Sequence, residues 1–452
     1  VVTVRTDGGG NAVTVESDIA ERPISVTDAL GNTSTTHYDA FHDQPSVETD
    51  AQGNTSCYKY DVRGRKIAEW GTAIQPVCFE YDDADNMVAL STFRAGEEII
   101  ISDPSNRTDN DTTAWSFHPT TGLELCKTYA DNTSVTKTYD AYNRLATETD
   151  ARGNVKTHAY EHARGLLLST SYSDGTTVRQ FNYNHLGQVT QVTDDAGTRT
   201  FSYNNYGEKE TDSLLADGVT HLLTEKRDLF GRSLGYTYAK NSANQQTVNV
   251  SYGADGRIAT AGFVHGGVER QFTYEYLKGS DLLQKLSMPN NMTLTQSYEE
   301  KRDLLTSMQY HRGNTLVTQR DYSYDTMGRP LTRRTARQGK VVNDTFIHNT
   351  RSELTEALVN GKEYKYNYDN IGNRLTAAEA GNATSYTANE LNQYTSIQEN
   401  EEAVFSPVFD ADGNQTRIKT ETGIWEVVYN AENRPVSFTN SESNTVVECA
   451  YD

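Results

Sequence analysis

Short segments of alternating side chains recur along the chain. In TSCYKYD the alternation places Tyr58 and Tyr60 on one face of an extended segment, and in SVTKTYD it places Val135, Lys137 and Tyr139 together. This period of two residues is typical of β-strands, because successive side chains point to opposite faces of a sheet. The pattern therefore predicts strands, and helical periodicity is hard to find anywhere in the chain.

Turn-forming residues follow each predicted strand. After Tyr139, DAYNR supplies a tight turn, RLATET a second short strand, and DARGN another turn from Asp150. Gly and Asn permit a positive φ at such points, and Asp caps the turn through its side chain. One unit is thus predicted to be a strand, a tight turn, a second strand and a second tight turn.

Four phrases, YDVRGR, YDAYNR, YDTMGR and YDNIGNR, carry the predicted structural turn motif. In the first phrase, Tyr60 ends a strand, Asp61 starts the turn and Gly64 makes it tight. Arg65 begins the return strand and either folds back on the aspartate or lies over a tyrosine ring. The corresponding residues of the other phrases are Tyr139, Asp140 and Arg144; Tyr324, Asp325, Gly328 and Arg329; and Tyr368, Asp369, Gly372 and Arg374.

The units repeat at a nearly fixed period. Tyr38, Tyr60 and Tyr81 are 22 and 21 residues apart, and 452 residues hold about twenty such units. Two dozen residues cannot bury their own apolar face, so the units are expected to stack edge to edge. We therefore predict an all-β fold, a spiral or solenoid of about twenty hairpins that forms a curved sheet and one continuous segment over 1–452.

Two segments depart from the pattern. Residues 352–361, SELTEALVNG, are compatible with one short helix or with a pair of strands. The segment around 91–115 breaks the rhythm and is predicted to be an irregular insertion at the rim of the sheet.

Composition narrows the function classes. The chain is 35% hydrophobic, with 28 Tyr against 13 Phe and 3 Trp, and tyrosine favours strands with a wet edge. The formal net charge of −21 disfavours binding to nucleic acid or to an anionic membrane. No apolar segment approaches the ~20 residues that a membrane-spanning helix needs. The chain lacks an initiator Met, begins with VVTVRTDGGGN and stops inside a repeat at CAYD, so we expect it to be a piece of a longer polypeptide.

Metal and cofactor sites are not predicted. Cys57, Cys78, Cys126 and Cys449 show no CxxC spacing and are expected to be free thiols, although Cys57 and Cys78 are one repeat apart. FDADGNQTRIKTE places Asp410, Asp412, Asn414 and Glu421 at positions 1, 3, 5 and 12 of a calcium loop, but its glycine, Gly413, is at position 4 rather than 6. We interpret this segment as one more turn.

One candidate for catalysis is HAYEHARG, where alternation places His158, Tyr160 and His162 on one face of a strand. Such groups abstract the proton beside a uronate carboxylate in a polysaccharide lyase. However, Tyr160 occupies the ordinary repeat position, 21 residues after Tyr139, so the repeat already explains it. No catalytic residue is therefore assigned, and no GxSxG or phosphate-binding loop is present.

The recurring YD phrases, the turns TDARGN and DADGN, and the C-terminal series YTANELNQYTSIQ, FDADGNQTR and YNAENRPVSF resemble the YD-repeat, or Rhs, family. This family includes Rhs effectors, toxin-complex B and C subunits and teneurins. The resemblance covers essentially the whole chain. It implies hairpins that spiral into a hollow β-shell, which in toxins encloses a C-terminal toxic domain.

The resemblance also implies partners and a location. They are an encapsulated C-terminal domain or a companion shell subunit, in a bacterial protein that is secreted or on the cell surface. The family's shells are closed by a core motif rich in Asp-Pro that carries the aspartates of self-cleavage. Here the only Asp-Pro is Asp103-Pro104, inside the insertion, so neither self-cleavage nor a cargo domain is expected in this chain.

Three functions remain open from the sequence. The first is a structural shell segment that encloses or supports a domain outside the chain. The second is an adhesion module, because rows of exposed tyrosines stack on sugar rings and thereby bind glycans or partners. The third is the polysaccharide lyase that uses the His158 and Tyr160 pair.

Overall fold

The computed structural model describes residues 1–6, 11–94, 102–400 and 402–451. Within them the fold is all-β, with one three-residue 3₁₀ turn, η2 (Pro104–Asn106), as predicted from the alternation. No helix in these residues is long and apolar enough to cross a membrane.

The strands follow one another along the chain in three stretches. The first stretch has short strands: β1 (Val2–Thr6), β2 (Ala12–Ser17), β3 (Pro23–Thr27), β4 (Thr33–Tyr38), β5 (Pro45–Thr49), β6 (Thr55–Tyr60), β7 (Lys66–Trp70), β8 (Val77–Tyr81), β9 (Met87–Thr92), β10 (Asp111–Phe117), β11 (Glu124–Thr128), β12 (Ser134–Tyr139), β13 (Leu145–Thr149), β14 (Val155–Tyr160), β15 (Leu167–Tyr172), β16 (Arg179–Tyr183) and β17 (Val189–Asp194). The second stretch has mostly longer strands: β18 (Gly197–Tyr203), β19 (Lys209–Ala216), β20 (Val219–Arg227), β21 (Ser233–Lys240), β22 (Ala243–Tyr252), β23 (Ile258–His265), β24 (Val268–Tyr276), β25 (Leu283–Ser287), β26 (Met292–Tyr298), β27 (Leu305–Arg312), β28 (Thr315–Tyr324), β29 (Pro330–Arg337) and β30 (Lys340–His348). The third stretch comprises β31 (Leu354–Val359), β32 (Lys362–Tyr368), β33 (Arg374–Glu379), β34 (Asn382–Ala388), β35 (Tyr394–Glu399), β36 (Val408–Phe409), β37 (Gln415–Thr420), β38 (Gly423–Tyr429), β39 (Pro435–Asn440) and β40 (Thr445–Glu448).

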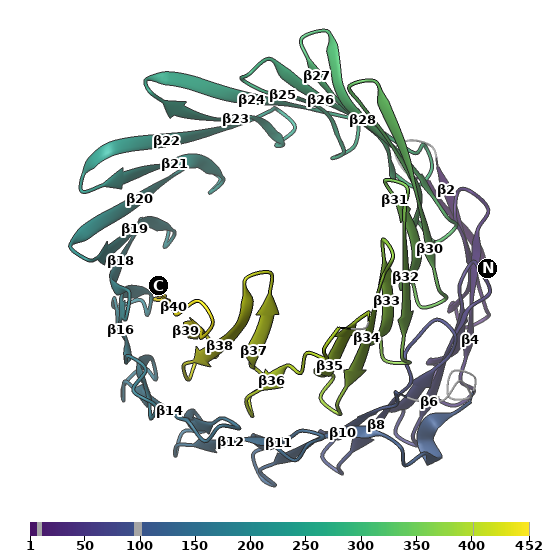
Figure 1. The fold of residues 1–452 in the computed structure, drawn as a ribbon, viewed down its shortest axis with the longest axis horizontal. Coiled ribbons are helices and arrows are strands. Elements are labelled where there is room, and N and C mark those ends of the chain that lie inside the picture. Colours follow the sequence, from purple (N-terminus) through teal and green to yellow (C-terminus); the bar gives the residue numbers. More distant parts are fainter. Residues whose placement is uncertain (7–10, 95–101, 401, 452) are drawn as a thin grey trace.

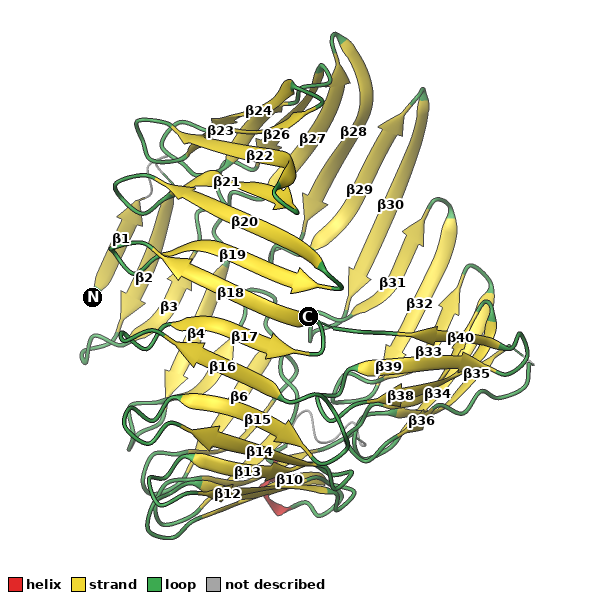
Figure 2. Ribbon diagram, turned by 90° about the vertical axis from the view of Figure 1, so that its left-hand side faces the viewer, coloured by secondary structure: helices red, strands yellow, loops and turns green. Residues whose placement is uncertain are grey.

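Every strand pairs antiparallel with the next one in sequence, apart from a break between β35 and β36. The described strands therefore form a 35-stranded sheet followed by a 5-stranded sheet. Figure 1 shows that the sheet winds into an open spiral around a hollow centre. The turn after β28 meets the turn after β5, and the turn after β32 meets the end of the segment that follows β9. Figure 2 shows that the second revolution is also displaced along the spiral axis.

The sheet has two edges with different turns. The YD turns all lie at one edge, which we call edge A, and the turns of the DAQGN type lie at the opposite edge, which we call edge B. Edge A of the first revolution lies with the N-terminus on the left-hand side of Figure 2, and the long hairpin tips of edge B lie on the right. From residue 197 onward most edge-B turns shorten to two residues, as at Asn360 and Gly361, which have φ values of 52° and 74°.

The two segments that depart from the repeat pattern, 352–361 and the insertion around 91–115, have different structures. Residues 352–361 form β31 and the tight turn to β32, so the strand-pair interpretation holds and the helix interpretation is wrong. The insertion is narrower than expected, because β9 extends to Thr92 and β10 starts at Asp111. Its residues 95–101 lie outside the described part of the chain. Its described end folds back over the sheet, where the Asp103 carboxylate accepts a 2.6 Å bond from Lys59 Nζ.

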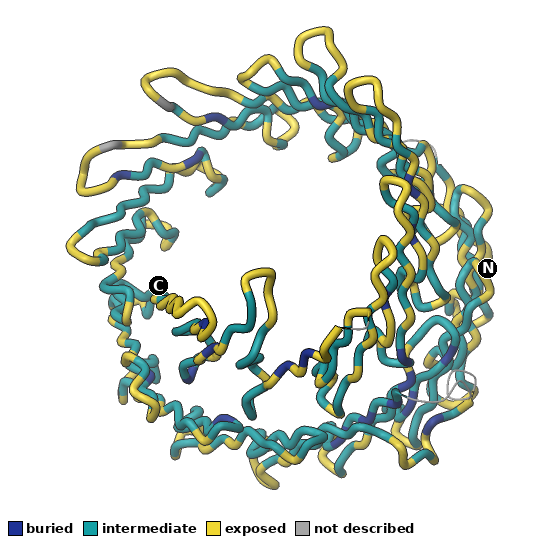
Figure 3. The backbone as a smooth tube through the Cα atoms, viewed as in Figure 1, coloured by how far each residue is buried: buried dark blue, intermediate teal, exposed yellow. Residues whose placement is uncertain are grey.

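The wall is one sheet thick, so most residues are half-buried and no central core exists within the described part (Figure 3). The largest fully buried side chains include Phe93, Pro76 and Pro104, which lie at edge B beside the insertion. This single-layer construction explains the low apolar content of the chain, since both faces of the sheet meet water.

Candidate functional site: the edge-A turns and the seam between successive revolutions

The first YD turn is closed by its aspartate. Asp61 Oδ1 accepts hydrogen bonds from the backbone N–H of Arg63 at 2.9 Å and of Arg65 at 3.0 Å, and Oδ2 accepts from Arg65 Nε at 2.7 Å. Gly64 lies at φ 80°, and its N–H donates to the Asp61 carbonyl. Burial raises the pKa of Asp61, but the hydrogen bonds from Arg65 and Arg63 outweigh this effect and hold the pKa below its usual value.

The same phrase joins each unit to its neighbours. The Tyr60 hydroxyl donates to the Pro45 carbonyl of the preceding strand at 2.6 Å. On the other side, the Arg65 guanidinium lies 4.8 Å from the centre of the Tyr81 ring and donates to the Asp82 carbonyl at 2.8 Å. One YD phrase therefore bonds to the unit before it and to the unit after it, which is how a single-layer wall stays rigid at its edge.

The phrases at Tyr139 and Tyr324 repeat these contacts. Tyr139 donates to the Glu124 carbonyl at 2.7 Å, Asp140 accepts from Arg144 Nε at 2.7 Å, and Arg144 lies 4.5 Å from the Tyr160 ring centre. Asp325 accepts from Arg329 Nε at 2.7 Å, and Gly328 has a φ of 80°. The hydroxyl-to-carbonyl bond is also made by Tyr38, Tyr81, Tyr160, Tyr183, Tyr203, Tyr252, Tyr298, Tyr324, Tyr368 and Tyr429.

The phrase at Tyr368 differs in its arginine. Asp369 accepts from the backbone N–H and from Nδ2 of Asn373, both at 2.8 Å, and Gly372 has a φ of 91°. Asn373 thus takes the position that Arg65 holds in the first turn. Arg374 comes one residue later because this phrase has one more residue before its arginine, and it lies 4.5 Å from the Tyr366 ring centre.

Edge A of the second revolution rests on edge B of the first. Gln52, in the edge-B turn after β5, accepts from Arg329 Nη2 at 2.8 Å, in the edge-A turn after β28. Asn11, after β1, donates to the Glu300 carbonyl, after β26. One revolution therefore takes between 28 − 5 = 23 and 26 − 1 = 25 strands. We call this contact between revolutions the seam.

Arg152 is the most heavily bonded residue of the seam. Its guanidinium donates to Asp412 Oδ2 at 2.5 Å, to the carbonyls of Tyr429 and Asn430 at 3.0 and 2.7 Å, and to Asn433 Oδ1 at 2.9 Å. The side chains of Arg152 and Asp412 are 16% and 5% exposed. Nearby acidic groups raise the pKa of Arg152 against the opposing effect of burial. This residue clamps two adjacent edge-A turns onto one edge-B turn.

A second group of bonds lies beside it. Glu432 accepts a hydrogen bond from the Tyr172 hydroxyl and pairs with Arg179 Nη2 at 3.1 Å. The backbone N–H of Ala431 donates to Asp174 Oδ2 at 2.8 Å. Burial raises the pKa of Asp174, but the hydrogen bonds from Thr176 and Ala431 outweigh it and lower the pKa.

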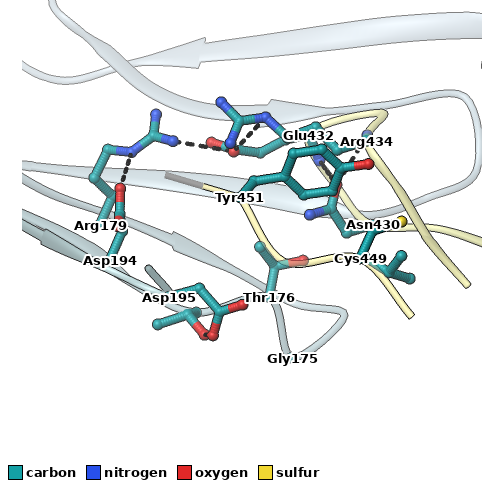
Figure 4. A pocket seen from close by; sticks show the side chains of 12 residues that line it. Gly175, Thr176, Arg179, Asp194, Asp195, Asn430, Glu432, Arg434, Cys449 and Tyr451 are labelled. Atoms are coloured by element: carbon teal, nitrogen blue, oxygen red, sulfur yellow. Dashed lines mark hydrogen bonds and ion pairs between the residues drawn. The ribbon is translucent and has the colours of Figure 1, made fainter. Parts of the chain in front are cut away.

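A pocket of about 260 Å³ opens where this part of the seam ends (Figure 4). Arg179 pairs with Asp194 at 3.7 Å, and Arg434 with Glu432 at 3.6 Å, so these charged groups neutralise one another. Cys449 and Tyr451 line the same pocket from the end of the chain. The arrangement holds two revolutions together by ion pairs and does not resemble a set of acid, base and nucleophile converging on a substrate.

The role of the seam residues was not predictable from the sequence. Arg152 lies in DARGN, and the equivalent position in DAQGN is Gln52, so both were treated as ordinary turn residues. Their hydrogen-bond partners Asp412, Asn433 and Arg329 are 260 to 281 residues away in sequence. Only the number of strands per revolution brings them together, and a local pattern carries no information about that number.

The lyase candidate is only partly brought together: the rings of His158 and Tyr160 lie 6.5 Å apart, but both side chains have other partners. His158 lies in β14, where its Nδ1 is 3.0 Å from Thr170 Oγ1, and Tyr160 donates to the Leu145 carbonyl at 2.8 Å. His162 lies in the turn beyond β14, so the expectation that all three share one strand face is wrong. Burial lowers the pKa of His158.

The loop at Asp410 is a turn of the edge-A type. Asp410 Oδ1 accepts from the backbone N–H of Asp412 and Asn414, and the Asp412 carboxylate bonds to Arg152. Glu421 lies beyond β37, at the other end of a six-residue strand, or roughly 20 Å away at ~3.3 Å per residue. The four positions of the calcium pattern therefore do not converge.

The cysteines lie apart on the sheet. Cys57 is in β6 and Cys78 in β8, with β7 between them, and all four cysteines are free thiols in the described structure. Burial raises the pKa of the Cys78 thiol to about 11, which favours the neutral and less reactive form.

Solved structures of the same architecture identify the fold. The chain is similar to a chain of the Photorhabdus luminescens Tc holotoxin pore, with a TM-score of 0.71 and 16% identity over 96% of this chain and 24% of that chain. It is also similar to TcdB2-TccC3, with a TM-score of 0.61 and 14% identity over 97% of this chain and 28% of that one. A TcdB2-TccC3 structure without its hypervariable C-terminal region gives a TM-score of 0.58 at 16% identity, over 96% of this chain and 28% of that one.

These similarities concern architecture. The chain spans about a quarter of the length of the chains that it matches. No protein-family model matches it. The fold expected from the YD phrases is nevertheless confirmed by the spiral of hairpins and by these structures: the chain has the YD-repeat, or Rhs, β-shell fold of the Tc toxin chains.

Proposed function

We propose that this chain is a structural segment of the wall of a hollow β-shell, which encloses or supports a domain outside the chain. The observation that carries the proposal is the seam. The second revolution binds the first through Arg152, Gln52 and Glu432, so the sheet closes on itself along the spiral instead of remaining an open ribbon. A wall that closes in this way surrounds an interior space.

The fold supports the same role. The matched chains belong to a holotoxin pore and to TcdB2-TccC3, one structure of which is described as lacking a hypervariable C-terminal region. By analogy, we propose that this chain works in a secreted toxin complex or a large cell-surface protein of a bacterium. Its partner would be an encapsulated domain or a companion shell subunit.

A protection experiment tests enclosure. Figure 1 places the C-terminal end inside the ring of the first revolution and the N-terminus on its outer wall. A short peptide with a trypsin site, fused after Asp452, should be cleaved several-fold more slowly by bead-bound trypsin than the same peptide fused before Val1. Soluble trypsin on the unfolded protein should cut both peptides equally. Equal cleavage of both fusions in the folded protein would overturn the proposal.

No observation on the described residues supports adhesion or the lyase activity. Adhesion through rows of tyrosines requires free phenol faces, but the YD tyrosines are half-buried and their hydroxyls bond to backbone carbonyls, as Tyr60 does to Pro45. The lyase requires free acid and base groups, whereas His158 lies 3.0 Å from Thr170 Oγ1 and the Tyr160 hydroxyl donates to the Leu145 carbonyl. The shell role is therefore the function that the geometry supports best.

A further inference from the structure

The insertion shows which face of the wall meets the hollow centre. η2, the coiled ribbon below β6 in Figure 1 and the red segment in Figure 2, lies on the outer side of the ring in both views. Lys59 of β6 points toward it, because its Nζ donates to the carboxylate of Asp103 at the start of η2. Ala68, opposite Lys59 in β7, is fully buried on the same face. The face of Lys59 is therefore the outer face of the wall.

The tyrosines of the YD phrases consequently lie on the inner face. Successive side chains of a strand point to opposite faces, so Tyr60, next to Lys59, faces the hollow centre. Later units keep the tyrosine in the same position, with the same hydroxyl bond to the preceding strand. In β34 this position is held by Ala388, and Tyr386, two residues earlier, pairs with Ile397 of β35. Ile397 is therefore an inner-face residue.

The wall is interrupted directly beyond β35. Pro407 lies in the segment between β35 and β36, and it has no N–H to donate to a neighbouring strand. Within the described residues, this segment pairs with β35 through one isolated bridge, Ile397 with Phe405, and with β37 through the two residues of β36 alone. The two strands of this hairpin therefore splay apart on the side of edge B.

A pocket of about 470 Å³ opens where the strands splay. Its apolar part consists of Ile397, Phe405 and Ile418, and Phe405 is 8% exposed. Ile397 fixes the pocket on the inner face of the wall, and Ile418 lines it from the other side of the break. We call it the inner pocket.

Acidic groups outnumber basic ones at the mouth of the inner pocket. Lys419 Nζ lies 3.9 Å from the Glu399 carboxylate and 3.6 Å from that of Glu402. Glu421, which also lines the pocket, is exposed. Three carboxylates thus lie near the mouth with one ammonium group, and such a mouth attracts a cation.

A further revolution of the spiral would not cover this pocket. The contacts between revolutions join turns at the edges of the sheet, as Gln52 does with Arg329 and Arg152 with Asp412. The inner pocket opens on a face of the sheet, which a revolution stacked on either edge leaves free. Its occupant therefore comes from the hollow centre.

We propose that the inner pocket anchors an extended segment of the enclosed polypeptide, which inserts a large apolar side chain next to a lysine or arginine. The proposal rests on the shell function proposed above. The apolar part of the pocket takes the apolar side chain, and the carboxylates of Glu399 and Glu421 take the neighbouring cation. An extended segment fits because the splayed strands leave backbone edges beside the pocket, to which a peptide adds as a strand.

Binding of a short fluorescent peptide, in which Phe and Lys alternate, to the whole chain tests the proposal. Fluorescence anisotropy should show saturable binding that weakens as salt is raised, because part of the attraction is between exposed charges. A peptide with Glu in place of every Lys, or with Ser in place of every Phe, should bind about tenfold more weakly or worse.

Paired variants locate the binding. Ile418→Ser should weaken binding of the Phe-Lys peptide about fivefold or more, because it removes part of the apolar lining. Its matched control is Ile424→Ser, which removes the same side chain from the outer face, opposite Lys419, and should leave binding unchanged. Glu421→Lys should also weaken binding, whereas Glu426→Lys, the same change of charge at a 63% exposed outer-face residue, should not.

Circular dichroism of every variant checks that the fold is intact. Absence of binding to the native chain up to about 1 mM peptide, the range of very weak association, would overturn the proposal. Equal weakening by the two members of each variant pair would also overturn it, because the peptide would then bind elsewhere. A failure of enclosure would appear in the trypsin experiment and not in peptide binding, so the two failures are distinguishable.

Discussion

The short-stranded region from β4 to β17 and the long-stranded region from β18 to β34 are built from the same YD unit but differ at edge B. Strands β5 and β6 have five and six residues, and their edge-B turn, 50–54, is wide. Strands β20 and β22 have nine and ten residues, and the edge-B turns around them have two residues. At edge A both regions keep the wide turn closed by Asp or Asn.

The difference in turn width at edge B goes together with the contacts between revolutions. Wide edge-B turns offer side chains and backbone groups that reach the next revolution, as Gln52 and Arg152 do. Two-residue turns with positive φ at both residues, such as Asn360-Gly361, match the twist of a hairpin. They complete the hairpin without contacts to another revolution. Within the described residues the edge-B turns that bond to the next revolution are wide, and the following experiments test how much these contacts contribute.

Acid should have the largest effect, and it should open the seam region first. The pKa values of Asp28 and Asp174, at edge B, are lowered, because hydrogen bonds from their own turns outweigh the effect of burial. A carboxylate with a lowered folded pKa stabilises the fold above the unfolded pKa of about 3.9, and this contribution is lost as the pH falls through the folded value. Hydrogen exchange between about pH 5 and 2.5 should lose protection in 23–178, where these carboxylates lie at the edge that carries the seam, before 209–276, where the lowered pKa values of Asp212, Asp228 and Asp255 stabilise contacts within one revolution only. Loss in the reverse order would contradict the comparison.

Removal of the seam clamp should be the most damaging single substitution. Arg152→Ala leaves the nearly buried Asp412 carboxylate without its partner, which we expect to cost about 2–4 kcal/mol of unfolding free energy, below the usual 3–5 because Arg152 keeps some exposure. Proteolysis should then reach 410–434. The control is Arg63→Ala, a turn arginine at edge A of the first revolution with a 46% exposed side chain, which should cost under about 0.5 kcal/mol.

Valine in place of a turn glycine should be the next most costly change. Gly64 and Gly328 both have a φ of 80°, which a β-branched residue avoids, so Gly→Val at either should cost about 1–3 kcal/mol. New proteolytic cuts should appear near 60–70 for the first and near 324–334 for the second. Gly→Asn is the matched control, since Asn143 occupies the equivalent position at φ 62°. Equal damage from Asn and Val would show that strain is not the cause.

The loss of one turn carboxylate should cost less. Asp61→Ala removes the acceptor of two backbone N–H groups and of Arg65, and we expect a loss of about 0.5–2 kcal/mol in a denaturation experiment. Asp61→Asn should retain much of the stability, because Asn184 closes its own turn in the same way. If Asp61→Asn were as damaging as Asp61→Ala, the ion pair with Arg65 would be the main contribution.

The hairpins and turns, which depend on neighbouring residues, were predictable from the sequence. The contacts between revolutions, which depend on the number of strands per revolution, were not. Alternation around Tyr60 and the turn residues Asp61 and Gly64 are decided by neighbours within one unit, so the hairpins and their turns were predictable. Arg152 and Asp412 meet because one revolution takes about two dozen strands, which depends on the twist and coil of the whole sheet. Arg374 shows the limit even within a unit, since one extra residue moved it out of the turn.

Removal of calcium should have the smallest effect of all. A cation at the Asp410 loop would need several oxygens converging within about 2.3–2.6 Å of one point. Asp410 already accepts backbone N–H groups, Asp412 is bonded to Arg152, and Glu421 lies beyond the next strand. The thermal midpoint should therefore not change when a chelator is added, either in the native chain or in Glu421→Gln. A fall of several degrees with chelator, reversed by calcium, would show that the loop holds a cation and that its carboxylates do more than close a turn and the seam.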